Sequence, residues 1–183
     1  MGQLLMRRPH LNDVPQAPLP DGFQVREASA RPADEVELAK VLSEAFHESW
    51  TRETVEERLT HANDVKAVYV VSGPHGTVAT ASSRYLPDRF PSEGYVHWVA
   101  TLPSQTQRGL ASYLIARLLR DFQERGYIAA VLETDDFRVP AIRTYLKMGF
   151  IPLYEVGQED HRDRWSAVFQ EVLASRRNGS PKI

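Results

Sequence analysis

Cysteine is absent from all 183 residues of the chain. Its absence excludes disulfide bonds, thiolate metal sites and a cysteine nucleophile, and it leaves the redox compartment open. Long apolar runs are also missing, since no segment approaches the roughly 18 uninterrupted apolar residues of a membrane-spanning helix. The first residues show no apolar run after a basic stretch. We therefore expect no secretory signal and a cytoplasmic location.

An excess of positive charge is lacking as well. The chain has 22 Lys and Arg residues against 24 Asp and Glu residues, which gives a net charge of -2. Nucleic-acid binders and membrane-surface binders present a basic face, so we expect neither kind of partner. Five of the six histidines are scattered along the chain without the spacing of metal ligands: His10, His47, His61, His75 and His161. We therefore expect no metal site.

The patterns that are present predict one mixed α/β domain. Residues 1–21 are rich in proline, which predicts an irregular lead-in, and residues 22–177 follow as the domain before a frayed tail at 178–183. Apolar alternation or continuous apolar runs predict strands at 23–27, 66–72, 77–85, 94–101, 128–133 and 150–155. Helical spacing predicts helices at 34–46, 51–59, 109–125, 136–148 and 160–176. Gly126 is expected to end the third helix.

The segment Val96–Leu114 is the most informative part of the sequence. A strand ends, a tight turn follows, and a helix begins at the small residues Gly109 and Ala111. The free N–H groups and partial positive charge of a helix N-terminus favour an anion such as pyrophosphate. Gly109 allows close approach of the backbone, and Gln107 and Arg108 can add a donor and a cation.

This segment is neither a P-loop nor a dinucleotide-binding fingerprint, because the Gly-Lys-Ser/Thr and G-x-G-x-x-G patterns are missing. It resembles the acyl-CoA-binding motif of the GNAT superfamily, in which V-x-x-x-P precedes R/Q-x-x-G-x-G/A. Val99 and Pro103 match the first part, and Gly109 and Ala111 match the small positions. Thr106 stands where that family prefers Arg or Gln.

A second motif follows in the proper order. Residues 136–150 resemble the GNAT pattern N-x-x-A-x-x-x-Y-x-x-x-G-F through Ala141, Tyr145, Gly149 and Phe150. Arg138 replaces the usual Asn. The resemblance covers residues 66–155, and the general character of the chain is similar to the mycothiol-synthase-like branch of the superfamily. The seventh strand that usually closes the sheet has no counterpart, because the following residues have helical spacing.

The resemblance implies a single GNAT-like domain with a mixed central sheet of about six strands. The sheet would be splayed between the fourth and fifth strands, flanked by helices and followed by an extra C-terminal helix. Acetyl-CoA would enter the splay as the acyl donor, with no metal. The residues expected to contact it are Val99, Ala100, Thr101, Thr106, Gln107, Arg108, Gly109, Leu110, Ala111, Ser112, Arg138 and Ala141.

Three side chains are candidates for the two proton transfers that the resemblance implies. Tyr145 is the candidate general acid, because a tyrosine with an ordinary pKa of about 10 is protonated at neutral pH. His97 is the first candidate for the general base and Glu133 the second. Each candidate has a purely structural alternative. Tyr145 could be a core aromatic residue, and His97 could be a hydrogen-bonded strand histidine.

The function implied is transfer of an acetyl group from acetyl-CoA to a primary amine by direct attack. The acceptor would be an amine-bearing small molecule or a peptide. The two departures, Thr106 and Arg138, keep a second reading open, that of a non-catalytic acyl-CoA-binding regulatory module. The sequence also leaves a homodimer open.

Overall fold

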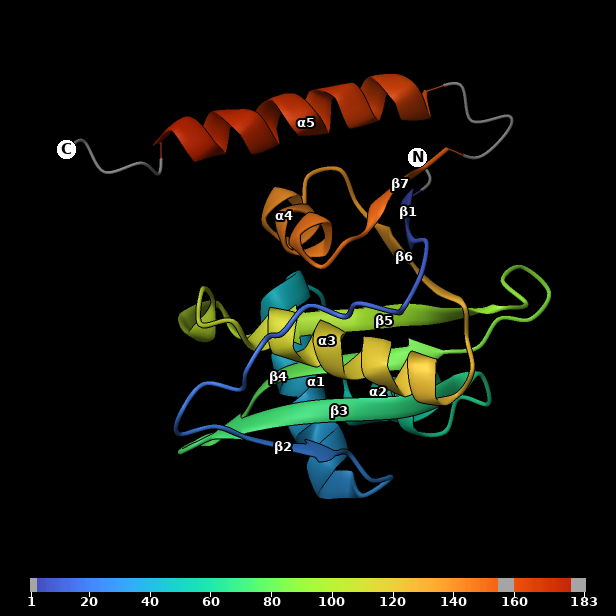
Figure 1. Ribbon diagram of the computed structural model, residues 1–183. Helices are drawn as coiled ribbons and strands as arrows, with labels where there is room; N and C mark the ends of the chain where they lie inside the picture. Colours follow the sequence, from blue (N-terminus) through green and yellow to red (C-terminus); the bar gives the residue numbers. More distant parts are fainter. Residues whose placement is uncertain (1–2, 155–159, 179–183) are drawn as a thin grey trace.

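The computed structural model describes residues 3–154 and 160–178. Its centre is a seven-stranded sheet in the order β2-β3-β4-β5-β6-β1-β7 (Figure 1). The strands are β1 (Leu4–Arg8), β2 (Gln24–Glu27), β3 (Val65–Gly73), β4 (Gly76–Arg84), β5 (Glu93–Thr101), β6 (Ala129–Thr134) and β7 (Ile151–Leu153). The helices are α1 (Pro32–Phe46), α2 (Arg52–Val55), α3 (Leu110–Glu124), α4 (Val139–Lys147) and α5 (His161–Asn178). A π-helical turn, Glu56–Thr60, extends α2.

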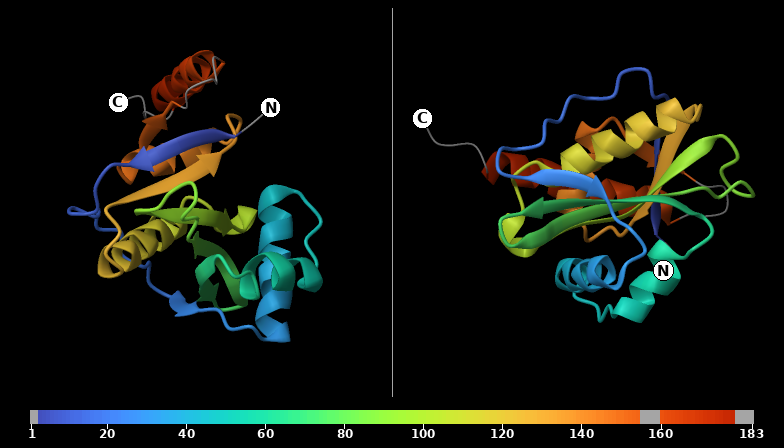
Figure 2. Two further views of the ribbon diagram at one scale, coloured as in Figure 1. Left: turned by 90° about the vertical axis from the view of Figure 1, so that its right-hand side faces the viewer. Right: turned by 90° about the horizontal axis from the view of Figure 1, so that it is seen from below.

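The sheet forms the middle layer between helices (Figure 2). α1 and α2 lie on one face and α3 on the other, and both α1 and α3 pack against β4 and β5. α4 lies beside the part of the sheet formed by β6, β1 and β7, and it contacts α5 (Figure 1). Among the described helices, not one combines the length and the apolar character that crossing a bilayer requires.

α3 shows how the sequence pattern sets the packing. Leu110, Leu114, Leu118 and Phe122 recur every four residues and are all buried in the core. The helix ends where Gly126 adopts a left-handed conformation, with φ at 81°, as its sequence predicts. The buried face of α3 and its C-terminal end are therefore set by residues that can be recognised in the sequence.

The sheet opens between β5 and β6, the fourth and fifth of the predicted strands. These two strands are parallel and pair at only three positions, from Glu93–Ala129 to Tyr95–Val131. β5 continues to Thr101 along β4, so its later residues have no partner on the β6 side. The predicted splay is confirmed.

The expectation of an irregular lead-in at residues 1–21 is wrong for Leu4–Arg8. This segment forms β1, which lies antiparallel between β6 and β7. It raises the number of strands to seven, where about six were expected from the sequence. The physical reason is burial, since Leu4 and Met6 are both fully buried.

The remaining elements agree with the prediction apart from their limits. The strand expected at 150–155 is short, and the helix expected at 136–148 begins at Val139. The extra C-terminal helix is present as α5. The frayed tail expected at 178–183 lies outside the described residues beyond Asn178, as does residue 155 of the last strand.

Candidate active site

A β-bulge in β5 shapes the candidate active site. The register between β4 and β5 shifts between Thr80–Ala100 and Ser82–His97, so β5 has one extra residue. Trp98 lies in the bulge and has a φ of 44°, which is uncommon for a bulky side chain. The bulge breaks the usual alternation of side chains along the strand. As a result, the rings of the neighbouring residues His97 and Trp98 lie only 4.8 Å apart between centroids. Both rings therefore face the same region.

A cavity of about 210 Å³ lies at the open end of the sheet. Its wall combines aromatic residues with charged residues that come from α1, the end of β4, β5, the end of β6 and the start of α4. The lining residues that define its character are Phe46, Arg84, Tyr95, His97, Trp98, Glu133, Asp135, Arg138 and Tyr145. Such a concave site with aromatic walls and a few polar groups is typical of a small-molecule site.

The N-terminus of α3, which follows β5 in the chain, has the features of an anion-binding turn. Gly109 is the N-cap residue, with φ at 82°, and no side chain caps the helix. The first N–H groups of α3 thus lack both an intrahelical partner and a side-chain acceptor. Gln107 also has a positive φ, at 63°, and residues 106–109 are exposed. This turn can hold a phosphate group through its backbone.

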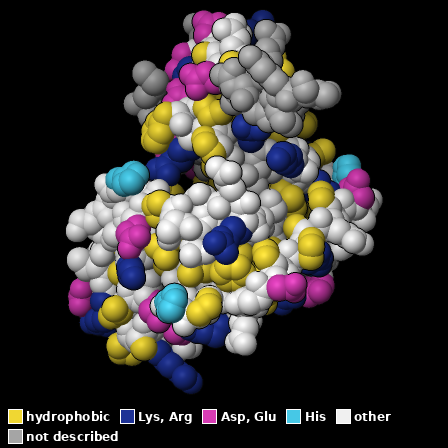
Figure 3. Space-filling model, turned by 90° about the vertical axis from the view of Figure 1, so that its left-hand side faces the viewer, with side chains coloured by type: hydrophobic (Ala, Val, Ile, Leu, Met, Phe, Trp, Pro, Cys, Tyr) yellow, Lys and Arg dark blue, Asp and Glu magenta, His cyan; other side chains and the backbone are white. Residues whose placement is uncertain are grey.

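Figure 3 shows the face of the molecule that was on the left in Figure 1. The surface is hollowed between the upper part, which carries α5, and the body of the molecule below. Lys and Arg side chains gather around this hollow. Their charge favours the approach of an anionic ligand to this side of the molecule.

Tyr145 projects from α4 into the cavity wall. Its side chain is 8% exposed, and its ring packs edge-on against Phe150 at 6.1 Å between centroids. Burial raises the pKa of the Tyr145 hydroxyl to about 12. The phenol therefore holds its proton firmly and can serve as a hydrogen-bond donor in the cavity.

His97 is neutral in this environment. Burial, and then the positive charge of Arg84, lower the pKa of the imidazole to about 3. Its Nδ1 lies 3.4 Å from the hydroxyl oxygen of Ser82, which donates to the backbone carbonyl of His97 at 3.0 Å. At neutral pH the ring can accept a hydrogen bond, but it takes up a proton only weakly.

Glu133 is held by two neighbours. Its carboxylate accepts hydrogen bonds from the Tyr95 hydroxyl at 2.7 Å and from Arg89 at 2.6 Å. Burial and the nearby Glu133 carboxylate raise the pKa of Tyr95, so that its hydroxyl remains a donor. The carboxylate is thereby fixed at the end of β6 with its charge facing the cavity.

The residues of this region fit an acyl-CoA arm in the opening. The indole Nε1 of Trp98 and the hydroxyl of Thr101 are buried without a hydrogen-bond partner, and both belong to β5. Buried polar groups are normally satisfied, so unpaired donors beside an open strand edge indicate a ligand with amide and carbonyl groups. The uncapped turn at Gly109 suits the diphosphate of the same molecule.

The structure divides the predicted site residues into two groups. Three segments lie along the path from the opening to the turn: residues 99–101 on β5, residues 106–109 in the turn, and residues 110–112 at the start of α3. Ala100 and Leu110 turn their side chains into the core, so only their backbones can meet a ligand. The cavity group consists of His97, Val99, Glu133, Arg138, Ala141 and Tyr145. Val99 thus belongs to both.

Several cavity residues were not predicted from the sequence. Tyr95, Arg84 and Trp98 were not among the expected site residues. The geometry of β4 and β5 brings the first two to the cavity, and the bulge brings Trp98 there. Gln3 immediately precedes β1, the strand that the sequence analysis missed altogether. A Trp next to a His on a β-strand is the only signal that could have indicated the bulge, and it is weak.

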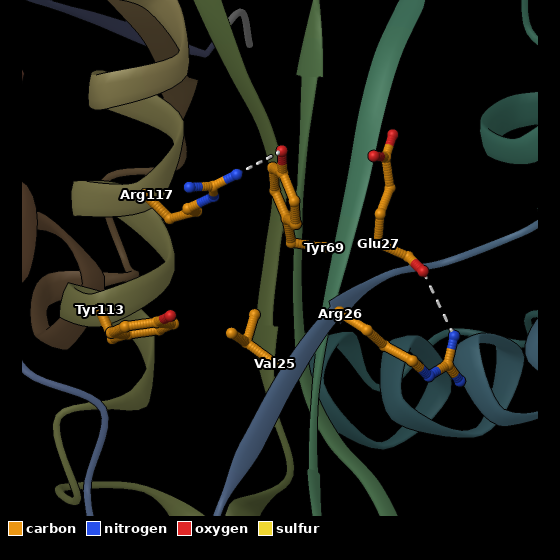
Figure 4. Close-up of a pocket in the computed structure, with 6 residues that line it drawn as sticks. All are labelled: Val25, Arg26, Glu27, Tyr69, Tyr113 and Arg117. Atoms are coloured by element: carbon orange, nitrogen blue, oxygen red, sulfur yellow. Dashed lines mark hydrogen bonds between the residues drawn. The ribbon is translucent and has the colours of Figure 1, made fainter.

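A second hollow, of about 230 Å³, lies between α3 and the strands β2 and β3 (Figure 4). Arg117 and Tyr113 project from α3 toward Tyr69 and Val25. The Tyr69 hydroxyl donates to Asp121, and Arg117 donates to that hydroxyl at 3.4 Å. These polar groups are matched within the protein, unlike those of the opening.

Among the described residues, no group of three or more His, Cys, Asp or Glu side chains could hold a metal ion.

Comparison with known sequences agrees with this geometry. Residues 36–150 match the family model described as the acetyltransferase (GNAT) family. The chain is similar to a mycothiol acetyltransferase from Nocardia farcinica (strain IFM 10152), with 31% identity over 156 residues. That alignment covers 77% of this chain and 49% of the relative, so the chain spans about half the length of the curated relative it matches.

Solved structures show the same fold. A GCN5-related N-acetyltransferase from Sphaerobacter thermophilus superposes with a TM-score of 0.62 at 18% identity, over 84% of this chain and 50% of that one. A GCN5-related N-acetyltransferase from Kribbella flavida gives 0.59 at 19% identity, over 83% and 55%. The ribosomal-protein-S18-alanine N-acetyltransferase from Escherichia coli gives 0.58 at 18% identity, over 72% and 80%. By its sequence match and its splayed sheet, the chain belongs to the GNAT family of acetyltransferases.

Proposed function

We propose that this protein transfers an acetyl group from acetyl-CoA to a primary amine. The observation that carries the proposal is the opening of the sheet between β5 and β6, with a cavity that contains Tyr145 beside β5 and the uncapped N-terminus of α3 following β5 in the chain. Family membership and the similarity to a mycothiol acetyltransferase support the reaction class. The expected acceptor is a small molecule or a peptide.

The chain binds the donor through its backbone more than through its side chains. The N–H groups at the start of α3 would hold the diphosphate, with Gln107 and Arg108 beside it. The free edge of β5 at Val99 and Thr101 would pair with the amides of the pantetheine arm. This division explains why Thr106 can replace the usual Arg or Gln, because the turn geometry at Gly109 is kept.

The chemical step is a direct displacement. The nitrogen of a neutral amine attacks the thioester carbonyl carbon, a C–N bond forms, and the C–S bond breaks to release the thiolate. The nitrogen loses one proton and the sulfur gains one, so the two proton transfers balance. An N–H of the bulged β5 strand is a suitable donor to the carbonyl oxygen as charge develops there.

Tyr145 would act on the leaving sulfur. With its pKa near 12, the phenol is protonated at every physiological pH. Complete transfer to a thiolate with a pKa of about 8.5 is uphill by roughly 5 kcal/mol, at about 1.4 kcal/mol for each pKa unit. The hydroxyl therefore acts as a hydrogen-bond donor to the developing thiolate, and the released thiolate takes its proton from water, which balances the proton lost by the amine.

His97 and Glu133 remain the two candidates for the residue that receives the proton of the amine. A His97 imidazole with a pKa near 3 cannot deprotonate an ordinary ammonium group, whose pKa is about 10. It can orient a neutral amine by accepting a hydrogen bond. We therefore propose orientation by His97, with the proton passing to the Glu133 carboxylate or to water once the C–N bond has formed.

The proposal is tested by release of CoA thiol from acetyl-CoA in the presence of a broad panel of primary amines. The protein has no cysteine, so a thiol reagent reports only the product. Wild type should release thiol with at least one amine, and Tyr145→Phe should lose about 10²- to 10³-fold in kcat at an unchanged Kd for acetyl-CoA. Binding of acetyl-CoA without turnover of any amine would instead support a non-catalytic acyl-CoA-binding module.

A further inference from the structure

The N-terminal strand brings one polar side chain to the edge of the candidate active site. β1 pairs with β6 so that Leu4 lies opposite Thr134. This register carries Gln3 to Asp135, the first residue after β6, with Gln3 Nε2 at 3.5 Å from Asp135 Oδ1. Gln3 also lines the cavity. A strand from the beginning of the chain thus contributes to the wall of the site.

A row of contacts runs from Gln3 across the mouth of the cavity to α1. Asp135 Oδ2 accepts a hydrogen bond from Arg138 Nε at 2.8 Å. The guanidinium carbon of Arg138 lies 4.7 Å from the centroid of the Phe46 ring, a cation–π distance. Along this row, Asp135 and Arg138 compensate each other's charge. Gln3 is its uncharged end.

The backbone that carries Gln3 is firmly anchored. Leu4 and Met6 are fully buried, and the buried Arg8 donates to the carbonyl of Met148 at 2.8 Å. Gln3 itself is exposed. A substitution at this position therefore changes the chemistry of the cavity wall without removing packing from the core.

We infer that Gln3 contacts the acceptor amine and is a specificity-determining residue for the transfer reaction; this inference rests on the function proposed above. With the amide nitrogen at Asp135, the amide oxygen is left to accept a hydrogen bond. The acceptor class that fits is a primary amine with a second hydrogen-bond donor, such as a diamine or an amino alcohol. The reacting amine would face His97 and Tyr145 while the second group meets Gln3 and Asp135.

The test changes the charge at position 3 in opposite directions. Gln3→Glu and Gln3→Lys are compared with wild type on 1,4-diaminobutane, ethanolamine and propylamine at saturating acetyl-CoA. The matched controls are Gln24→Glu and Gln24→Lys, because Gln24 is also an exposed glutamine at the beginning of a strand. Thiol release gives KM and kcat, and calorimetry gives the Kd of acetyl-CoA.

Wild type should show a lower KM for 1,4-diaminobutane and ethanolamine than for propylamine. Gln3→Glu should lower the KM for 1,4-diaminobutane about two- to fivefold and Gln3→Lys should raise it by a similar factor, as for an exposed ion pair. The kcat and the Kd of acetyl-CoA should stay unchanged, and the Gln24 variants should behave as wild type.

Three results would overturn the inference. The first is a KM shift in the same direction in both Gln3 variants. The second is an equal KM shift in the Gln24 variants. The third is an unchanged KM in both Gln3 variants. Turnover of other amines without turnover of 1,4-diaminobutane or ethanolamine would contradict the acceptor class. Failure of the proposed function has a different signature, since no amine of the panel would then be acetylated, whether or not acetyl-CoA binds.

Discussion

Replacement of Gly109 by alanine separates the binding role of the α3 turn from its structural role. Gly109 has a φ of 82°, and a Cβ atom built there would meet nothing within 4 Å. Gly126, at the other end of α3, has a φ of 81° and equally open surroundings. The two glycines therefore have the same backbone conformation and equally open surroundings. They differ in position, because Gly109 precedes α3 and Gly126 follows it.

The cost in stability should be the same for both variants. A non-glycine residue in the left-handed region costs about 1–2 kcal/mol, and part of this is offset because alanine restricts the unfolded chain. We expect Gly109→Ala and Gly126→Ala each to lower the free energy of unfolding by about 1 kcal/mol. For a chain of this length, that corresponds to a decrease in Tm of about 2–4 °C.

The effect on binding should differ between them. The methyl group of Gly109→Ala would stand where a diphosphate approaches the free N–H groups of α3. Loss of one hydrogen bond to a charged group costs about 1.5–3 kcal/mol, which weakens the Kd of acetyl-CoA roughly 10- to 100-fold. Gly126→Ala should bind acetyl-CoA as wild type does. Calorimetric titration and thermal unfolding of both variants measure the two quantities, and equal affinities for acetyl-CoA would refute the assignment of the turn.

Three further predictions follow from individual side chains. The kcat/KM for an amine acceptor should rise with pH between about 6 and 9 without a break near 6.5, because the pKa of His97 is lowered to about 3; a break near 6.5 in the initial-rate profile would contradict this. Arg8→Met should cost about 2–4 kcal/mol in urea unfolding, since it leaves the Met148 carbonyl without its buried donor; an unchanged midpoint would show that β1 is not anchored there. Arg26 and Ser29 lower the pKa of Asp34 to about 2, so this carboxylate stabilises the fold above pH 3.8 and the contribution is lost as the pH falls toward 2. Asp34→Asn should therefore cost about 1–2 kcal/mol at pH 7 and almost nothing near pH 2, as measured by unfolding at both pH values.

The turn and the helix to which we assign acyl-CoA binding could be predicted as structural elements from the sequence, because they depend on local structure. The spacing of Leu110, Leu114 and Leu118 fixes the buried face of α3, and Gly109 marks the turn before it. Both signals lie within a few residues of the groups they position. The splay between β5 and β6 was expected from the family resemblance, and the strands that form it were visible as apolar runs.

β1 could not be predicted, because its formation depends on residues far away in the chain. Leu4 pairs with Thr134, and Leu5 pairs with Leu153 on the other side. The five residues of β1 show no apolar–polar alternation, and four of the five are buried, so side chains on both faces of the strand are covered. The prolines that follow favour an irregular reading of the whole segment.

The wall of the cavity could be predicted only in part for a similar reason. In a regular strand, His97 would share a face with Tyr95 and would lie opposite Trp98. The bulge brings the Trp98 side chain to the same side of the strand as His97. The Trp50 ring packs against the Trp98 ring there, at 4.6 Å between centroids. A bulge depends on the pairing with the neighbouring strand, so single-strand periodicity does not contain it.

The central claim is that acetyl-CoA occupies the opening between β5 and β6, and a backbone amide NMR titration tests it most directly. On addition of acetyl-CoA, the largest shifts should fall on residues 98–101 of β5 and residues 107–112 at the start of α3. Shifts confined to the second hollow, at Val25, Tyr69 and Arg117, would contradict the claim. The absence of any shift at saturating acetyl-CoA would contradict both the site and the proposed reaction.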